Sequence, residues 1–270
     1  MISPAPETLD VLRDGGLLRV VLNRPRKRNA MSLLMVTELE AVFAAVEADE
    51  TVRVVVLRGA EGHFCAGGDV SDMATAAGKA VDGVDPIAAM NLRFGKMLRM
   101  VDASRAAVVA VCEGAVMGGG LGLACVADVT LAVSTARFRL PETSLGLPPA
   151  QIAPFMVRRL GLSQARRLAV TGQTLDAAQA LSLGLAHEHV GADQVNDAVE
   201  RLLGQILRCE PGAVGETKRL VNAAAVEPLS DVLQAGAQAF AAAARSPLAA
   251  AGFQAFLRKK SPPWASGVGE

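Results

Sequence analysis

The stretch Glu113-Gly114-Ala115-Val116-Met117-Gly118-Gly119-Gly120-Leu121-Gly122-Leu123-Ala124-Cys125-Val126-Ala127-Asp128 determines much of how this chain can fold. An apolar strand at 107–112 leads into it, and its glycine run opens a short apolar helix that ends near Ala127. A glycine run at a helix N-terminus exposes backbone N–H groups at the positive end of the helix dipole. Such a turn can bind phosphate, stabilise an anion that develops during a reaction, or simply let the helix pack closely on a sheet.

A second glycine loop, Phe64-Cys65-Ala66-Gly67-Gly68-Asp69, also follows a strand and is expected to precede a helix. Neither loop matches the Walker A pattern, because no Lys and Ser/Thr pair follows the glycines. Neither spells the Rossmann fingerprint G-x-G-x-x-G. Gly118-x-Gly120 with Gly122 comes near it, but no acidic residue about 20 positions later ends a second strand, because Glu142 follows a proline instead. Two interpretations of these loops therefore stay open: they form an oxyanion site, or they only allow a helix to pack closely on the sheet.

The elements around these loops repeat as strand-strand-helix units. Hydrophobic patterning predicts a hairpin at 7–22 that turns at Asp14-Gly15-Gly16, and a helix from Leu33 to about Ala48 that is capped by Ser32. Strands are predicted at 53–57, 107–112, 128–134 and 137–140, with a helix at 87–101. The stretch from roughly 72 to 85 is expected to have little regular structure. The pattern predicts an α/β fold built from crossover units.

From Ala150 onward the composition changes to helices. Helical spacing covers segments near 151–160, 163–170, 176–183, 193–208, 212–225, 230–244 and 247–258. Gly161, Gly172 and Gly184 separate the first of them. We therefore predict a core domain at 1–190 and a helical C-terminal module at 191–270.

Composition excludes several classes of function. The chain has 270 residues with 27 basic and 27 acidic side chains, so the excess of positive charge that nucleic-acid binding needs is missing. Four cysteines without C-x-x-C spacing and three histidines give no zinc pattern, and we expect the cysteines to be small buried thiols. No apolar run approaches the ~20 residues of a membrane span, and the N-terminus has no signal-peptide pattern. We expect a cytoplasmic protein.

Taken in order, these stretches resemble the enoyl-CoA hydratase/isomerase (crotonase) family. The matching segments are 22–30, 52–59, 64–69, 114–128, 138–147, 166–188 and 256–264. The resemblance implies a crotonase-like spiral of ββα repeats with a C-terminal helical trimerisation module, and homotrimers that pair into hexamers. It implies an acyl-CoA thioester substrate and no metal or organic cofactor.

The resemblance also implies particular site residues. The backbone N–H groups of Gly68 and Gly119 would form the oxyanion hole for the thioester oxygen, where a glycine allows close approach. The CoA moiety would lie over Lys27 and Ala30 and beside Ala66, and Lys259 and Lys260 could meet its phosphates. Asp69, Val70 and Gly122 would also bind the substrate, besides Gly68 and Gly119. Asp69 is expected to order its own turn. The two lysines at the C-terminus could come from a neighbouring subunit.

The acid/base residue is where this sequence departs from the two-glutamate hydratases that it resembles. Those enzymes have one glutamate just after the glycine run and another in a Pro-Glu element. Here Gly122 stands at the first position, and Glu142 is the sole matched catalytic carboxylate. One carboxylate with a raised pKa can serve either hydration or double-bond migration.

The sequence segment from Pro141 to Phe155 is similar to the corresponding segment of bacterial isohexenylglutaconyl-CoA and methylglutaconyl-CoA hydratases. We therefore expect a hydratase for a branched glutaconyl-type thioester, in which Gly122 leaves volume for a branch or a second carboxylate of the acyl chain. Two alternatives stay open: a Δ3,Δ2-enoyl-CoA isomerase, and a crotonase-like protein that binds acyl-CoA without turnover.

Overall fold

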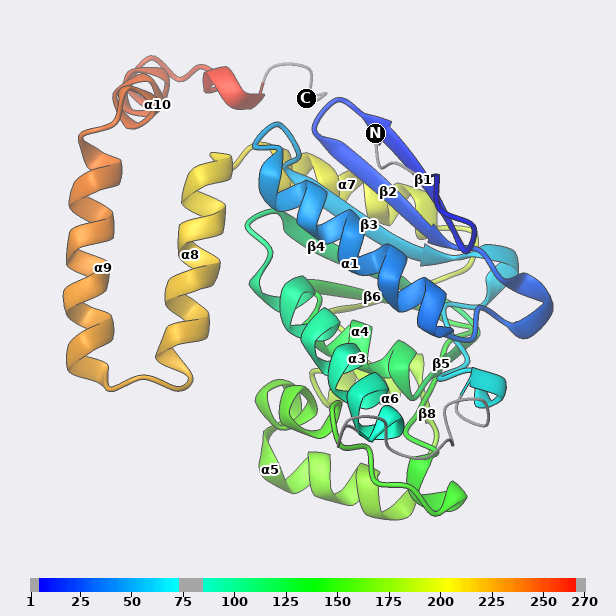
Figure 1. Cartoon of the computed structure of the whole chain (residues 1–270). Coiled ribbons are helices and arrows are strands. Elements are labelled where there is room, and N and C mark those ends of the chain that lie inside the picture. The colour runs from blue at the N-terminus through cyan, green and yellow to red at the C-terminus, as the bar shows by residue number, and fades with distance from the viewer. Residues whose placement is uncertain (1–4, 73–84, 266–270) are drawn as a thin grey trace.

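A computed structural model describes residues 5–72 and 85–265 (Figure 1). The predicted irregular stretch near 72–85 lies almost wholly outside the described residues. At the N-terminus, β1 (Leu9–Asp14) and β2 (Leu17–Leu22) pair antiparallel, with Asp14 opposite Leu17. The predicted hairpin turn is confirmed, since Gly15 provides the positive φ of 52° that it needs.

The larger sheet has the strand order β1-β2-β3-β4-β6-β9 among the described residues, and every pairing after β1–β2 is parallel. Parallel neighbours require crossovers. Helix α1 (Leu33–Ala48) joins β2 to β3 (Val54–Gly59), and α3 (Pro86–Ala103) lies between β3 and β4 (Ala107–Cys112). Helix α4 (Gly119–Val126) precedes β6 (Val129–Val133), and β9 (Glu188–Val190) forms the far edge. The cap of α1 is the predicted one, because Ser32 Oγ accepts the Met35 N–H at 3.1 Å.

Both faces of this sheet are covered, as the apolar strands predict. Along β3, Val55 and Leu57 belong to a core shared with α1, α3 and α4. Val54 and Val56 point the other way, into a second core with α7 (Val195–Leu207). Figure 1 shows α1 and α3 on one side of the sheet and α7 on the other.

A second, smaller sheet positions the glycine run. Its strands are β5 (Ala115–Met117), β7 (Arg137–Arg139) and β8 (Leu175–Asp176), in the order β5-β7-β8 among the described residues. Strand β5 ends one residue before Gly118, and the Gly118 N–H donates to the Arg139 carbonyl of β7 at 3.0 Å. Strand β7 was predicted, at 137–140, but β5, β8 and the sheet that the three strands form were not, because strands of two or three residues show no period. The same is true of β9.

The remaining elements are helical. Helix α5 (Ala153–Thr171) is bent at Gly161, with φ 72°, where the sequence predicts two helices. It is followed by α6 (Ala177–Ser182), α8 (Pro211–Ala224), α9 (Leu229–Ala244) and α10 (Pro247–Leu257). Single 3-10 turns lie at Pro25–Lys27, Ala60–Gly62, Glu142–Leu145 and Pro263–Ala265. In Figure 1, α8 and α9 extend away from the sheet, and no residue of α9 or α10 is buried.

The fold is the predicted α/β arrangement with a helical C-terminal region. One expectation about its core is wrong: Cys65, Cys112 and Cys125 are buried, but Cys209 is exposed. Within the described part of the chain, no helix combines the length and hydropathy that a bilayer crossing needs. No group of three or more candidate metal ligands lies together in that part either.

Candidate active site

The two glycine loops that the sequence singled out meet in space. A Cβ placed on Gly118 would lie 3.4 Å from Gly67 Cα, and one placed on Gly67 would lie 3.4 Å from the Met117 carbonyl oxygen. Both glycines have positive φ values, 102° at Gly67 and 48° at Gly118. Only glycine adopts such conformations at low cost and permits so close an approach of two backbones.

The first loop is fixed against the residue that precedes α1. The Met31 N–H donates to the Gly67 carbonyl at 2.7 Å, and the Asp69 N–H donates to the Met31 carbonyl at 2.9 Å. These bonds place Gly68 between two anchored residues, and Gly68 itself is exposed. Among the described residues, no hydrogen bond uses the Gly68 N–H. That donor is therefore free for a ligand.

The second loop is fixed by β7 and opens α4. Gly118 donates to Arg139, so the turn is held while α4 begins at Gly119. The first N–H groups of a helix have no intrahelical acceptor, and within the described ranges the Gly119 N–H has no hydrogen-bond partner. A Cβ at Gly119 would lie 3.4 Å from Phe94 Cζ and 3.5 Å from Met31 Sδ. The surroundings of this second free donor are thus apolar.

Glu142 lies against the second loop. Its Oε1 is 2.7 Å from the position that a Cβ on Gly118 would occupy. The carboxylate is half-buried, and its Oε2 is buried without a hydrogen-bond partner in the described structure. Burial raises the pKa of Glu142, against a smaller lowering by its own backbone N–H. A carboxyl group of this kind can accept and return a proton near neutral pH.

The space beside Gly122 is filled by apolar side chains. A Cβ on Gly122 would lie 3.1 Å from Leu98 Cδ1 and 3.4 Å from Ile152 Cγ1. Both side chains are buried, with 0% and 4% of their surface exposed. The expectation that Gly122 leaves open volume for the substrate is therefore wrong: Leu98 of α3 and Ile152, which precedes α5, occupy that side of α4.

Asp69 ties the first loop to the segment before α1. Its Oδ2 accepts from Arg24 at 2.7 Å and from Lys27 Nζ at 2.9 Å, and its Oδ1 accepts the Ser71 N–H at 3.1 Å. Burial tends to raise the pKa of Asp69, but the hydrogen bonds from Ser71, Lys27 and Arg24 outweigh it and hold the pKa well below its usual value. The expected role of Asp69 in its own turn agrees with this geometry.

The other proposed contacts of CoA fall into two groups. Near the first loop, Ala30 and Ala66 are half-buried, the Ala66 N–H donates to the Arg28 carbonyl at 3.0 Å, and Val70 is 68% exposed. These residues and Lys27 lie together. Lys259 and Lys260, by contrast, follow α10, which Figure 1 places beyond α9 and far from α4 in the same chain. The structure of one chain does not bring these two lysines to the glycine loops.

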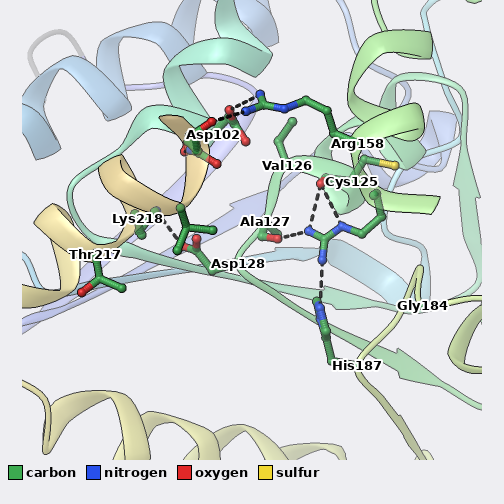
Figure 2. Close-up of a pocket in the computed structure, with 13 residues that line it drawn as sticks. Asp102, Cys125, Val126, Ala127, Asp128, Arg158, Gly184, His187, Thr217 and Lys218 are labelled. Atoms are coloured by element: carbon green, nitrogen blue, oxygen red, sulfur yellow. Dashed lines mark hydrogen bonds and ion pairs between the residues drawn. The ribbon is translucent and has the colours of Figure 1, made fainter. Parts of the chain in front are cut away.

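A cavity of about 440 Å³ lies at the opposite end of α4 (Figure 2). Four of its charged side chains form two ion pairs, Arg158 with Asp102 at 3.1 Å and Lys218 with Asp128 at 2.6 Å, and Arg159 donates to the Cys125 carbonyl at 3.1 Å. His187 accepts the Thr130 N–H at 2.9 Å, and burial together with the nearby Arg159 lowers its pKa. This cavity lies beside α8 and contains none of the residues of the glycine loops.

Several residues at the site were not found from the sequence. Phe94, Leu98 and Ile152 surround Gly119 and Gly122, and Arg24 binds Asp69. One signal was available for α3, because Gly95 interrupts an otherwise good helix, and an isolated glycine there often marks a close approach. No sequence signal identifies which apolar side chains of α3 face α4.

Comparisons with known proteins agree with this geometry. The family model described as enoyl-CoA hydratase/isomerase matches residues 13–267. The crystal structure of an enoyl-CoA hydratase/isomerase from Marinobacter aquaeolei is 48% identical, with a TM-score of 0.93 over 96% of this chain and 100% of that one. Pseudomonas aeruginosa AtuE is 49% identical, with the same TM-score and coverage.

A curated relative matches in sequence as well. The short-chain-enoyl-CoA hydratase of Clostridium acetobutylicum is 30% identical over 216 residues, which is 78% of this chain and 79% of that protein. The fold and the family match extend over nearly the whole chain. This protein therefore belongs to the enoyl-CoA hydratase/isomerase (crotonase) family and is an enzyme of that family.

Proposed function

We propose that the enzyme adds water across the α,β double bond of an enoyl-CoA thioester, with Glu142 as its general acid/base. The observation that carries this proposal is the position of the Glu142 carboxylate, which lies against Gly118 with one buried, unpaired oxygen. The free N–H groups of Gly68 and Gly119 support an oxyanion hole at the same place.

In the proposed reaction, ionised Glu142 takes a proton from water while the water oxygen bonds to the β-carbon. The electron pair of the double bond moves to the thioester oxygen, which the N–H groups of Gly68 and Gly119 stabilise. Glu142 then returns its proton to the α-carbon and is ionised again. Each oxyanion donor should contribute a rate factor of ~10²–10³.

For the substrate we propose a branched glutaconyl-type thioester, as the similarity of residues 141–155 suggests. The half-buried, apolar side chain of Phe94, which packs over Gly119, supports an acyl chain with hydrocarbon next to the reacting carbons. Lys27 is proposed to bind the CoA moiety from this chain, and Lys259 and Lys260 from a neighbouring one.

The second candidate activity is a Δ3,Δ2-enoyl-CoA isomerase. One observation favours it: Leu98 and Ile152 pack against Gly122, the position at which the two-glutamate hydratases that this sequence resembles have a glutamate, and apolar side chains cannot orient a water molecule. Removing a proton at one carbon and returning it at another needs only Glu142.

The absorbance of the conjugated thioester separates the two activities. The enzyme is mixed in turn with crotonyl-CoA, 3-methylglutaconyl-CoA and a 3-enoyl-CoA. Hydration lowers the absorbance with the first two, most rapidly with 3-methylglutaconyl-CoA, and isomerisation raises it with the third. Glu142→Gln should lose the activity by ~10²–10⁴-fold; a fully active variant would remove Glu142 from the mechanism.

We also propose assembly into homotrimers or hexamers through the C-terminal helices. The supporting observation is an apolar surface on α9 and α10 that the chain itself leaves exposed: Leu229, Leu233, Phe240, Phe253, Phe256 and Leu257. Large exposed apolar patches mark association sites. Light scattering on wild-type protein and on Phe240→Ser should show a trimer or hexamer that the substitution weakens, and a monomeric wild type would contradict the proposal.

A further inference from the structure

A pair of amide side chains lies where α3 meets the segment before α5. The Gln151 Nε2–H donates to Asn91 Oδ1 at 3.0 Å. This contact depends on Gly95, which lies one turn after Asn91 on α3: a Cβ on Gly95 would be 2.0 Å from Gln151 Oε1. A glycine inside a helix costs about 1 kcal/mol relative to alanine. Here it creates the space that the Gln151 amide fills.

The amide pair lies on the face of α3 that packs against the candidate active site. Asn91, Gly95 and Leu98 are spaced by four and three residues, so they share one face of α3. Leu98 contacts Gly122 together with Ile152, the residue after Gln151, and Phe94 covers Gly119. From Leu98 to Asn91 the helix rises by about 10 Å. On this face the half-buried Phe94, which covers Gly119, is only three residues from Asn91, so hydrocarbon beside the proposed oxyanion donor is followed by two polar amides.

The pair retains hydrogen-bonding capacity. The Gln151–Asn91 bond uses one N–H of Gln151 and the carbonyl of Asn91. In the described part of the chain, no other hydrogen bond engages the Asn91 Nδ2 group or the second N–H of Gln151. Asn91 is exposed and Gln151 half-buried, so a ligand can reach them. Three N–H donors thus remain for an acceptor group.

We propose that Asn91 and Gln151 bind the distal carboxylate of a dicarboxylic acyl-CoA, and so select glutaconyl-type substrates over simple enoyl thioesters. This inference rests on the proposed function, because it assigns the specificity of that same site. A carboxylate accepts several hydrogen bonds, and bonds to a charged group are stronger than neutral ones. An acyl chain that ends in a methyl group leaves these donors without an acceptor.

The test uses binding of two saturated thioesters that cannot be hydrated. Glutaryl-CoA carries a distal carboxylate and butyryl-CoA does not, and calorimetry measures both with the assembled enzyme. Wild type should bind glutaryl-CoA more tightly. Gln151→Leu should weaken glutaryl-CoA by about tenfold and butyryl-CoA by less than twofold. Gln151→Glu should weaken glutaryl-CoA further, since it places a like charge beside the carboxylate.

Gly95→Ala provides an independent variant that leaves Gln151 chemically unchanged. Its methyl group must displace the Gln151 amide, while alanine favours the helix, so the protein should fold and should lose the glutaryl-CoA preference as Gln151→Leu does. Gln205→Leu, which removes an exposed amide on α7, is the matched control and should bind both ligands as wild type does. Equal affinity of wild type for the two thioesters, or equal weakening of both by the variants, would overturn the proposal. Because no turnover is measured, failure of the hydratase assay is a separate result.

Discussion

The carboxylate of Glu142 and the backbone of Gly118 are in direct contact, and no side chain can stand between them. A Cβ at position 118 would be 2.7 Å from Glu142 Oε1 and 3.6 Å from its Cδ. The same glycine approaches the first loop, at 3.4 Å from Gly67 Cα. The absence of a side chain at Gly118 therefore allows the acid/base and the first glycine loop to approach the same backbone.

Gly118→Ala should accordingly reduce kcat while the protein remains folded. Its methyl group moves the Glu142 carboxylate away, and a misplaced general base is expected to lose ~10²-fold or more in rate. Gly15→Ala is the matched control, because Gly15 has a similar φ of 52° with nothing within 4 Å of its Cβ position. Steady-state kinetics of both variants make the comparison. Equal kcat values would show that the Glu142–Gly118 contact has no part in the reaction.

The pH dependence of kcat/KM should show an acidic limb due to Glu142. Burial raises the pKa of this carboxyl above its ordinary 4.5, and the hydration step needs the ionised form. The rate should therefore rise with pH through a pKa above 4.5. Initial rates from pH 4 to pH 9 measure it. A limb at or below 4.5 would mean that Glu142 is not the base in the free enzyme.

The same raised pKa should lower the stability of the wild type at neutral pH. Below pH 4.5 the carboxyl is protonated in the folded and the unfolded chain, so its charge contributes nothing. As the pH rises through the raised pKa, the folded protein has to ionise a desolvated group, which the unfolded chain ionises freely. Glu142→Gln should thus unfold at higher urea concentration than wild type at pH 7 and at nearly the same concentration at pH 4. A variant less stable than wild type at pH 7 would contradict this.

Asp69→Asn should lower both stability and kcat. It removes the carboxylate that binds Arg24 and Lys27, and breaking a largely buried ion pair costs about 3 kcal/mol. The Asp69 side chain is 6% exposed and that of Arg24 20% exposed. Lys27→Ala is the control for stability, because Lys27 is 51% exposed and such pairs are worth less than about 1 kcal/mol. Urea unfolding compares the two variants.

Hydrogen bonds from Ser71, Lys27 and Arg24 hold the pKa of folded Asp69 below its ordinary value of 3.8. The ionised carboxylate therefore stabilises the folded protein fully above pH 3.8, and this stabilisation is lost as the pH falls through the lowered pKa. The difference in unfolding free energy between wild type and Asp69→Asn should therefore become smaller at acidic pH. An Asp69→Asn protein as stable as Lys27→Ala at pH 7 would show that the pair with Arg24 contributes little.

The sequence predicted the parts of this structure that depend on local patterns. Strand β4 was placed at its observed bounds, and the cap of α1 at Ser32, because a buried strand and a capping serine leave clear local signals. The two-residue strand β8 leaves none, since it forms only by pairing with β7. At the site, glycines mark where backbones approach, so both loops were predicted. The side chains that face those glycines depend on how α3 and α5 pack against α4, which no local pattern determines.

At Gly122 the sequence identifies the glycine but not the side chains that pack against it. If Gly122 left open volume, as expected from the sequence, replacing it with glutamate would restore a second carboxylate and weaken branched substrates more than crotonyl-CoA. In the structure the first carbon of that side chain would already be 3.1 Å from Leu98 Cδ1. We therefore expect Gly122→Glu to lose activity on crotonyl-CoA and 3-methylglutaconyl-CoA alike, and to lose about 1–3 kcal/mol of stability through overpacking.

Shortening Leu98 should restore part of the activity that Gly122→Glu loses. In the double variant Gly122→Glu, Leu98→Ala, the shorter side chain leaves room for the new carboxylate, although Leu98→Ala alone should cost about 2–5 kcal/mol as a buried truncation. Activity on crotonyl-CoA should be higher in the double variant than in Gly122→Glu. If the two substitutions acted independently, their losses of activity would add and the double variant would be the less active one. Kinetics of the two single variants and the double variant complete the cycle. A Gly122→Glu enzyme with normal crotonyl-CoA activity would show that Leu98 and Ile152 do not block the second carboxylate.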